Sequence, residues 1–288
     1  MRQADVVTDL RRVAVWRGDA AVVVPADQPV VTAFDLGLGR GDGVFESVAV
    51  VDGGTPHLDD HLARMARSAA ILELADPGER TWRAMVDAVL ASWPVEIEGV
   101  CRLFLTRGLG AGLPPTALAL LSPVSPEVVR QRTAGLSVVT LGLGVPAAFR
   151  AEAPWLLGGA KTLSYAVNMA AQRHAQRLGA DDVVFTSLEG QVLEGPTSTV
   201  VWSADGVLHT PPLETGILAG TTCARLFARA GAAGRPTSFT AGTVDDLHAA
   251  DAVWLLSGVR GVATVHTLDG VHRGDAGLSA GVRALLAG

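Results

Sequence analysis

A single lysine, Lys161, lies among apolar and small residues, where its amine could act as a nucleophile or base. Lys161 follows the apolar and small residues 156–160 and precedes a helical pattern. Glu194 comes 33 positions later (194 − 161), in a Gly-Pro-Thr-Ser-Thr turn. A buried lysine can lose its charge and act as a nucleophile or base, and a carboxylate near a cofactor ring can hold a proton on it. The pair indicates pyridoxal phosphate (PLP) chemistry, in which a lysine Schiff base and an acidic partner of the pyridinium nitrogen recur.

A second segment offers what a phosphate group needs. Gly220 allows a tight backbone, and Thr221 and Thr222 open a predicted helix. Free N–H groups at that helix end, with two hydroxyls, would form an anion cradle, and Arg64 on an amphipathic helix could add a cation. Taken alone, these features are an ordinary threonine cap, a solvated helix arginine and a surface lysine. Together with Glu194 they favour a phosphate site.

Three other kinds of site are rejected. The glycines of residues 37–43 are spaced G-x-G-x-G and precede a strand, whereas a dinucleotide site needs G-x-G-x-x-G before a helix. This run is better interpreted as a loop that lines a pocket. His57 and His61 lack an acid-rich companion set and are predicted to be helix-surface residues, so no metal site is expected. A hydrolase elbow, G-x-S-x-G, is absent from the sequence.

The elements that must position these residues follow from periodicity. Residues 44–51 alternate as a strand and end at a hairpin signal, Asp52-Gly53-Gly54. Further strands are predicted at 101–107, 136–144, 182–186, 199–202 and 252–256, and helices at 57–73, 80–92, 164–178, 221–230 and 278–287. Strands dominate without a βαβ rhythm, which favours an α+β fold. A Pro- and Ser-rich piece at 122–132 predicts a linker between domains 1–121 and 133–288.

Composition sets the class of protein. The chain has 288 residues, 49% hydrophobic and 18% charged, with a net charge of −6. This balance is globular and argues against a nucleic-acid partner. Two cysteines suit a reducing cytoplasm. The first twenty residues contain acids and lack an uninterrupted apolar core, so no signal peptide is expected there, and no stretch is typical of a membrane helix.

The motifs resemble those of the class IV aminotransferases, the fold-type IV PLP enzymes. The resemblance runs from about residue 30 to 266 and rests on six motifs in the family's order: DLGLGRGDGVFES (35–47), HLARM (61–65), LTRG (105–108), AKTLSYAVN (160–168), GADDVVFTSLEGQVLEGPTSTVVW (179–202) and TPPLETGILAGTT (210–222). It implies a small α+β N-terminal domain, a larger β-barrel-like C-terminal domain and a homodimer. Its members act on small molecules that carry amino and carboxylate groups.

The resemblance also implies residue roles. Lys161 would form the Schiff base and shuttle the proton at the substrate's α carbon, and Glu194 would pair with the pyridine nitrogen. The phosphate would be bound by Arg64, the backbone N–H of Thr221 and the hydroxyl of Thr222. Tyr165 is a cofactor contact that stands one residue nearer to the lysine than in branched-chain enzymes. The substrate would meet Ser47, Arg40, Arg107 and Arg260.

Two departures bear on the substrate. Arg40 stands where an aromatic residue commonly precedes Gly-Asp-Gly, which indicates an anionic substrate and argues against a purely apolar branched-chain pocket. Val259, in the loop that contains Arg260, replaces a threonine that binds phosphate in some relatives.

Two reactions fit this family. A lyase would turn 4-amino-4-deoxychorismate into 4-aminobenzoate and pyruvate; an aminotransferase of the D-amino acid or branched-chain type would reprotonate the cofactor instead. Ser47 favours the lyase, because lyases of this family tend to have a hydroxyl there. D-amino acid enzymes tend to have Val and branched-chain enzymes Gly at that place. A non-catalytic binding protein would be expected to lack Lys161 or Glu194, and both are present.

Overall fold

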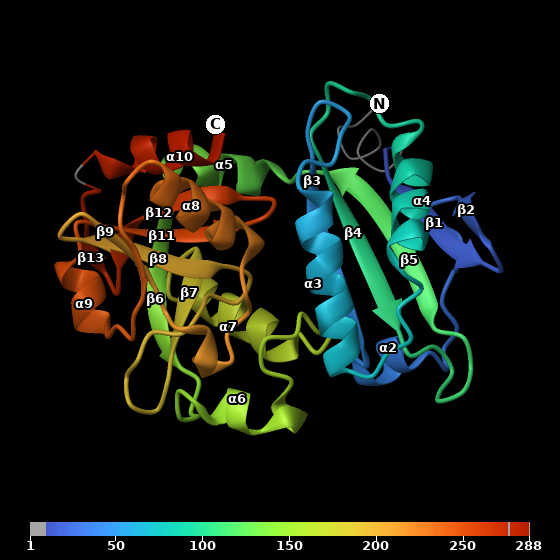
Figure 1. The fold of residues 1–288 in the computed structure, drawn as a ribbon, viewed down its shortest axis with the longest axis horizontal. Coiled ribbons are helices and arrows are strands. Elements are labelled where there is room, and N and C mark those ends of the chain that lie inside the picture. The colour runs from blue at the N-terminus through green and yellow to red at the C-terminus, as the bar shows by residue number, and fades with distance from the viewer. Residues whose placement is uncertain (1–9, 276, 288) are drawn as a thin grey trace. The chain divides into compact units, whose positions relative to one another are not determined.

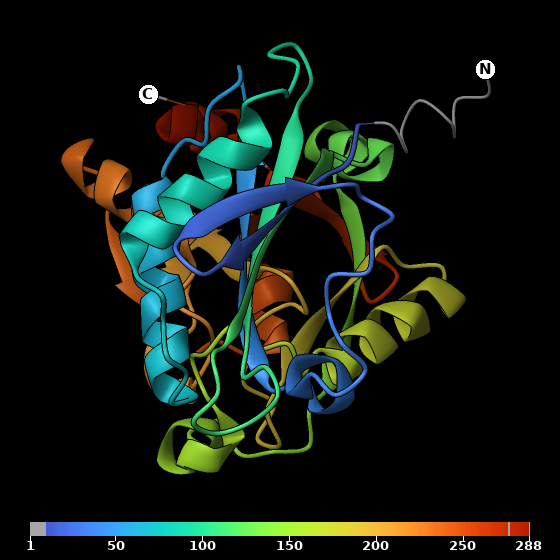
Figure 2. The ribbon, with the colours of Figure 1, turned by 90° about the vertical axis from the view of Figure 1, so that its right-hand side faces the viewer.

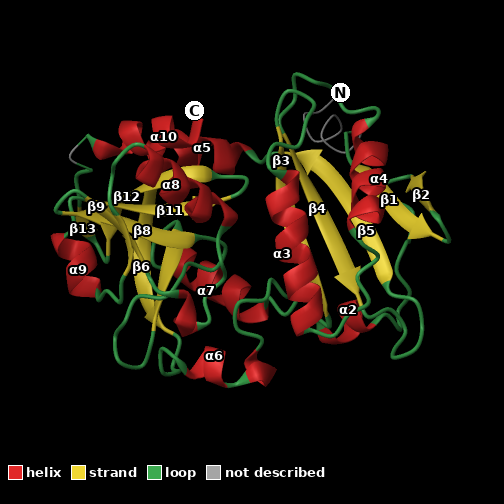
Figure 3. Cartoon of the chain, in the orientation of Figure 1, coloured by secondary structure: helices red, strands yellow, loops and turns green. Residues whose placement is uncertain are grey.

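The structure is a computed structural model, and it describes residues 10–275 and 277–287. Two units share the chain (Figure 1): an N-terminal unit of residues 1–125 and 160–165, and a C-terminal unit of residues 126–159 and 166–288. Each unit has its own sheet and helices, as the strands and helices of Figure 3 show, so the fold class is α+β. The expectation about the first twenty residues falls in part on residues 1–9, which lie outside the described residues.

The N-terminal unit is built on a five-stranded antiparallel sheet with the order β2-β1-β5-β4-β3. One face is covered by α3 (Leu58–Ile71) and α4 (Glu79–Leu90), which lie on the same side of the sheet in the turned view (Figure 2). Helix α3 packs against β3, and α4 packs against β1, β2 and β5. The strands are β1 (Arg12–Arg17), β2 (Ala20–Val24), β3 (Gly43–Val50), β4 (Gly99–Thr106) and β5 (Thr116–Pro123).

Strand β3 sends alternate side chains to the two faces of this sheet. Val44, Glu46 and Val48 are fully buried toward the helices. Phe45 and Ser47 are partly buried on the other face, which also carries an apolar cluster that includes Val13, Val15, Val24 and Leu118. Strand β3 therefore presents a polar residue, Ser47, on the face opposite to α3 and α4.

The C-terminal unit contains an eight-stranded mixed sheet, with the order β10-β9-β8-β11-β12-β6-β7 and β13 beside β12. Strand β11 divides its core: Val253 and Leu255 point to a cluster under α9, whereas Trp254 and Leu256 point to a cluster under α8 and α10. The strands are β6 (Leu136–Gly142), β7 (Asp182–Thr186), β8 (Thr199–Ala204), β9 (Val207–Thr210), β10 (Thr237–Phe239), β11 (Ala252–Ser257), β12 (Gly261–Leu268) and β13 (Val271–His272).

Helices and short turns surround this second sheet. Its α-helices are α5 (Pro126–Ala134), α6 (Phe149–Glu152), α7 (Ala166–Arg177), α8 (Thr221–Ala232), α9 (Val244–Ala249) and α10 (Leu278–Ala287), and two short 3₁₀ helices are η1 (Pro154–Leu156) and η2 (Leu213–Thr215). Strands β6 and β7 are parallel, with α7 between them in sequence, and so are β9 and β10, with α8 between them. The described residues therefore contain two βαβ-like crossovers that the periodicity did not predict.

The predicted strands and helices are confirmed, with small shifts of their ends, but three local expectations are wrong. The predicted linker contains the first boundary between the two units, at Ser125 and Pro126, but it is not an unstructured segment. It falls on the end of β5 and most of α5, because Pro123 closes a strand and Pro126 opens a helix. The glycine-rich loop contains a short helix, α2 (Leu36–Arg40). Asp35 caps the N-terminus of this helix, because its side chain accepts a hydrogen bond from the N–H of Gly37. The predicted hairpin is a tight turn closed by one bridge between Val51 and Gly54; β3 pairs with β4 instead.

The domain boundaries also differ from prediction, since residues 160–165 return to the N-terminal unit. Within the described residues, no helix is both long and apolar enough to cross a membrane. The same described residues contain no group of three or more His, Cys, Asp or Glu side chains that could hold a metal ion.

Candidate active site

The predicted site residues are divided between the two units. The N-terminal unit holds Lys161, Tyr165, Arg64, Ser47, Arg40 and Arg107, and the C-terminal unit holds Glu194, Thr221, Thr222 and Arg260.

Lys161 lies in a short extended segment that pairs with the edge of β3. Its carbonyl accepts the N–H of Phe45 at 3.0 Å, and the N–H of Leu163 donates to the carbonyl of Gly43 at 2.8 Å. The N–H of Lys161 donates to the hydroxyl of Ser68, on α3, at 3.1 Å. These bonds fix the backbone of the lysine from two sides, so the direction in which its side chain leaves the sheet is fixed as well.

Two aromatic rings lie close to the amine of Lys161. Nζ lies 4.5 Å from the ring centroid of Phe45 and 5.9 Å from that of Tyr165. The two rings meet edge to face with centroids 5.2 Å apart, and Phe45 also stacks on Phe104 of β4. Aromatic faces attract an ammonium group and restrict where it can lie. Tyr165 thus contacts both the lysine amine and Phe45, a residue whose importance was not predicted.

Arg64 is held in a buried charge cluster. Its Nε and Nη2 donate to the two carboxylate oxygens of Glu46 at 2.6 and 2.8 Å, and Nδ1 of His61 lies 2.8 Å from Glu46 Oε2. The Glu46 side chain is completely buried. Burial alone would raise the pKa of Glu46, but the hydrogen bonds from Arg64 and His61 outweigh it and lower the pKa to about 2.

This cluster corrects one prediction and adds a residue. His61 is only 2% exposed, so it is not a helix-surface residue. Glu46 was missed, although the alternation of β3 places it on the inward face with Val44 and Val48, where an acid requires a partner. The guanidinium of Arg64 has a fixed orientation, because two of its nitrogens donate hydrogen bonds to the Glu46 carboxylate.

Ser47 has an arginine as its cross-strand neighbour. In the β3–β4 register Ser47 lies opposite Arg102, and Phe45 lies opposite Phe104, so Arg102 is on the same sheet face as Ser47. Arg102 is exposed, and its Nη1 contacts only the Ser122 hydroxyl, at 3.5 Å. No carboxylate of the described residues forms an ion pair with it. Arg102 was not predicted; the strand alternation around Ser47 is the signal that could have found it.

Arg107 is bound within the N-terminal unit. Its Nε donates to Asp42 Oδ2 at 2.6 Å, and its Nη2 donates to the carbonyl of Leu72 at 2.7 Å. The hydrogen bond that Arg107 donates to the Asp42 carboxylate raises the pKa of the Arg107 guanidinium. These contacts favour a role in holding the loop before β3 over the predicted carboxylate contact. Arg40 is exposed in the last turn of α2.

In the C-terminal unit, both oxygens of Glu194 accept hydrogen bonds. Arg150 Nη1 donates to Oε1 at 2.9 Å, and the backbone N–H of Leu218 donates to Oε2 at 3.0 Å. The carboxylate is less than one-fifth exposed. It is therefore held in one plane by a side chain of α6 and by the backbone that follows η2.

The N-terminus of α8 has the features of a phosphate cradle. Gly220 is its N-cap, no side chain caps it, and the first helical bond runs from Ala224 N–H to the Gly220 carbonyl. The hydroxyl of Thr222 is buried and has no partner in the described part of the chain. A Cβ on Gly220 would lie 2.2 Å from Thr199 Oγ1, so a larger residue there would force the Thr199 side chain to move. Orphan N–H groups and an orphan hydroxyl suit the phosphate of PLP.

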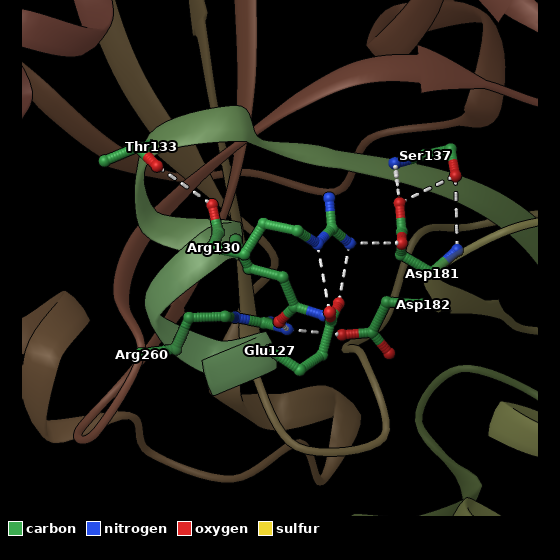
Figure 4. A network of polar contacts seen from close by, with 8 residues as sticks. Glu127, Arg130, Thr133, Ser137, Asp181, Asp182 and Arg260 are labelled. Carbon is green, nitrogen blue, oxygen red and sulfur yellow. Dashed lines mark hydrogen bonds and ion pairs between the residues drawn. The ribbon is translucent and has the colours of Figure 1, made fainter. Parts of the chain in front are cut away.

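Arg260 belongs to a buried network at the turn between β11 and β12 (Figure 4). Its Nη1 donates to Asp182 Oδ2 at 2.9 Å and to Gln131 Oε1 at 3.2 Å. Arg132 holds the same turn by donating to the carbonyl of Val259 at 2.8 Å. The Arg260 side chain is 8% exposed, and its charge is neutralised by Asp182. Its Nε and Nη2 are buried without a hydrogen-bond partner in the described part of the chain, so a substrate contact by Arg260 stays a prediction.

This network predicts a large loss of stability when one partner is removed. Asp182→Asn should lower the free energy of unfolding by about 3–5 kcal/mol, because the buried Arg260 charge loses its counter-charge. Asp245→Asn is the control: this acid is exposed in the first turn of α9 in the same unit, and its change should cost about 1 kcal/mol or less. Urea unfolding of both variants checks the prediction, and equal losses would contradict it.

Comparison with known proteins identifies the family of this chain. Residues 43–268 match the family model described as amino-transferase class IV, and the chain belongs to that family. Its fold is therefore fold-type IV, and its cofactor is PLP.

Three proteins illustrate how similar this chain is to other members of the family. A bifunctional aminodeoxychorismate lyase / D-amino acid transaminase of Mycobacterium tuberculosis is 43% identical over 88% of this chain and 90% of its own length. The PLP-bound form of a hypothetical aminotransferase from Mycobacterium tuberculosis aligns with a TM-score of 0.90 at 40% identity, over 96% of this chain and 97% of that one. A fold IV-transaminase from Curtobacterium pusillum aligns with a TM-score of 0.89 at 41% identity, over 96% and 98% of the two chains.

Proposed function

We propose that this chain is a PLP-dependent lyase that converts 4-amino-4-deoxychorismate into 4-aminobenzoate and pyruvate. The observation that carries the proposal is the pairing of Ser47 with Arg102 across β3 and β4. Both lie on the sheet face that carries Phe45, whose ring lies beneath the Lys161 amine. A hydroxyl for proton transfer and a cation for a carboxylate thus stand on the face that presents the lysine.

In this proposal, the amine, the pyridine nitrogen and the phosphate of the PLP site each have residues assigned to them. When bound, PLP withdraws electrons from the carbon that carries the substrate's amino group. Lys161 Nζ binds the cofactor and then moves the proton at that carbon, a role that the contacts with Phe45 and Tyr165 support by orienting the amine. Glu194 holds the proton of the pyridine nitrogen. Arg64, the Thr221 N–H and the Thr222 hydroxyl bind the phosphate.

The elimination needs one proton removed and one bond to oxygen broken. Lys161 takes the proton from the carbon that bears the amino group, and the bond from the ring to the enolpyruvyl oxygen breaks. The electron pair of that bond leaves with the oxygen as enolpyruvate, which gains a proton at its methylene carbon and becomes pyruvate, so the proton that was removed is returned. The ring becomes aromatic. The Ser47 hydroxyl assists by donating a hydrogen bond on the side of the departing oxygen. Arg102 and Arg40 bind the carboxylates of this dianionic substrate, in place of Arg107 and Arg260, which have partners within their own units.

An aminotransferase is the second candidate. The relative of 43% identity carries both activities in its name, and Lys161, Glu194 and the phosphate cradle would serve either reaction. A homodimer, expected from the family resemblance, also belongs to this proposal and is tested by light scattering. A place in the reducing cytoplasm agrees with Cys101 and Cys223, which are both free and buried.

The charge of Arg102 predicts a substrate-dependent effect. Arg102→Met should lower kcat/KM for 4-amino-4-deoxychorismate by roughly tenfold or more, because a hydrogen bond to a charged group contributes about 1.5–3 kcal/mol. Most of the change should be in KM. Arg83→Met, on an exposed ion pair of the same unit, is the control and should leave the kinetics unchanged. An unchanged KM in Arg102→Met would remove this residue from the substrate site.

Product analysis tests the proposal as a whole. The purified, PLP-loaded protein is given 4-amino-4-deoxychorismate, and in separate reactions D-alanine or L-leucine with 2-oxoglutarate. The expected products are 4-aminobenzoate and pyruvate in the first reaction, formed with the higher kcat/KM. Glutamate in the other reactions without any 4-aminobenzoate in the first would overturn the lyase in favour of the aminotransferase.

A further inference from the structure

Arg150 is the one side chain that donates to Glu194 in the described structure. It lies in α6, a helix of four residues that buries none of them, so its position does not come from an apolar core. It comes from backbone packing. A Cβ on Gly158 would lie 2.5 Å from the Arg150 carbonyl oxygen, and a Cβ on Gly216 would lie 2.7 Å from Arg150 Cβ. Two glycines therefore let α6 approach the backbone beside Glu194.

The same backbone supplies the second donor to Glu194. Gly159 N–H donates to the Gly216 carbonyl at 2.9 Å, two residues before Leu218, whose N–H binds Glu194 Oε2. The segment with Arg150 and the segment with Leu218 are thus hydrogen-bonded to each other, and each donates a hydrogen bond to one oxygen of the Glu194 carboxylate. Since a carboxylate has about four acceptor positions, Glu194 can accept one more donor while both contacts stay intact.

We propose that Arg150 is a positioning residue for the cofactor: it fixes the plane of the Glu194 carboxylate so that the remaining acceptor position faces the pyridine nitrogen of PLP. This inference rests on the proposed role of Glu194. The guanidinium suits the task because its N–H donors form a planar, rigid fork. A lysine at position 150 would keep the charge but lose that geometry.

The test measures cofactor binding, separately from turnover. Apo-protein is titrated with PLP, and the dissociation constant and the absorption spectrum of the bound cofactor are recorded for wild type, Arg150→Met and Arg150→Lys. Arg150→Met should weaken PLP binding about tenfold or more and change the spectrum, with partial recovery in Arg150→Lys. Arg130→Met is the matched control, an ion-paired arginine in the same unit whose partners are Glu127 and Asp181; it should change neither property.

Thermal unfolding of the apo-proteins separates positioning from a structural role. Arg150→Met and Arg130→Met should unfold within a few degrees of each other, while only Arg150→Met binds PLP weakly. A wild-type dissociation constant and spectrum in Arg150→Met would overturn the inference. So would weak binding that merely accompanies a large loss of apo-protein stability.

Glu194→Gln distinguishes failure of this inference from failure of the proposed function. If Glu194→Gln changes the spectrum and the affinity but Arg150→Met does not, Arg150 is not a positioning residue and the role of Glu194 stands. If Glu194→Gln leaves both unchanged, Glu194 does not meet the ring nitrogen, and the proposed function fails at that residue.

Discussion

Lys161→Ala is expected to abolish the covalent capture of PLP and to lower turnover by at least ~10²–10⁴-fold, the usual contribution of a positioned acid–base group. The loss of the nucleophile adds to this, because Lys161 is proposed to bind the cofactor as well as to move the proton. No other residue can replace it, since Lys161 is the only lysine in the sequence. The protein should also lose the absorbance near the visible edge that a bound Schiff base gives.

The single lysine makes this measurement unusually direct. Borohydride reduction of the PLP-loaded wild type should fix one cofactor per chain on the peptide that contains Lys161, as read by mass spectrometry. The same treatment of Lys161→Ala should fix none. A protein that refuses PLP, or a label found only on the chain's α-amino group, would contradict the assignment. Arg67→Met, an exposed change on α3, serves as the control that should label like wild type.

The buried Glu46 cluster is expected to have a large, pH-dependent effect on stability. Glu46→Gln removes the charge that pairs with Arg64 and should lower the free energy of unfolding by about 3–5 kcal/mol near neutral pH. The pKa of Glu46 is lowered from 4.5 to about 2 in the folded protein. A carboxyl whose folded pKa is depressed stabilises the fold above its unfolded pKa, and that stability is lost as pH falls toward the folded value.

Urea unfolding as a function of pH measures this contribution. The difference between wild type and Glu46→Gln should be constant above about pH 5 and should shrink as the pH falls toward 2, because protonated Glu46 then resembles the glutamine. Asp59→Asn, on the exposed start of α3, should show about 1 kcal/mol or less at any pH. A Glu46→Gln difference that does not change between pH 6 and 3 would contradict the assignment.

Local order was predictable from the sequence because it depends on neighbours along the chain. The alternation of residues 44–51 and the helical stripe of residues 57–73 each appear as the expected element. Prolines were the ambiguous signal: Pro126 was interpreted as part of a linker, whereas it begins α5. Proline suits both a loop and a first helical turn, so composition alone does not distinguish them.

The partners of the arginines were not predictable, because those contacts join distant parts of the chain. Arg107 pairs with Asp42 and Arg260 with Asp182, at separations of 65 and 78 residues. A sequence motif marks an arginine but not the carboxylate that neutralises it. Conversely, no motif marks Arg102 in its strand, and only the β3–β4 register places it opposite Ser47.

Turnover without an amino acceptor is the most direct test of the lyase. PLP-loaded protein is mixed with a large excess of 4-amino-4-deoxychorismate and no 2-oxo acid, and pyruvate and 4-aminobenzoate are measured over time. A lyase regenerates its cofactor in every cycle, so the account predicts many turnovers with the two products in a 1:1 ratio. A transaminase stops after one amino transfer per site. Product formation limited to one equivalent per chain, or 4-aminobenzoate without pyruvate, would contradict the account.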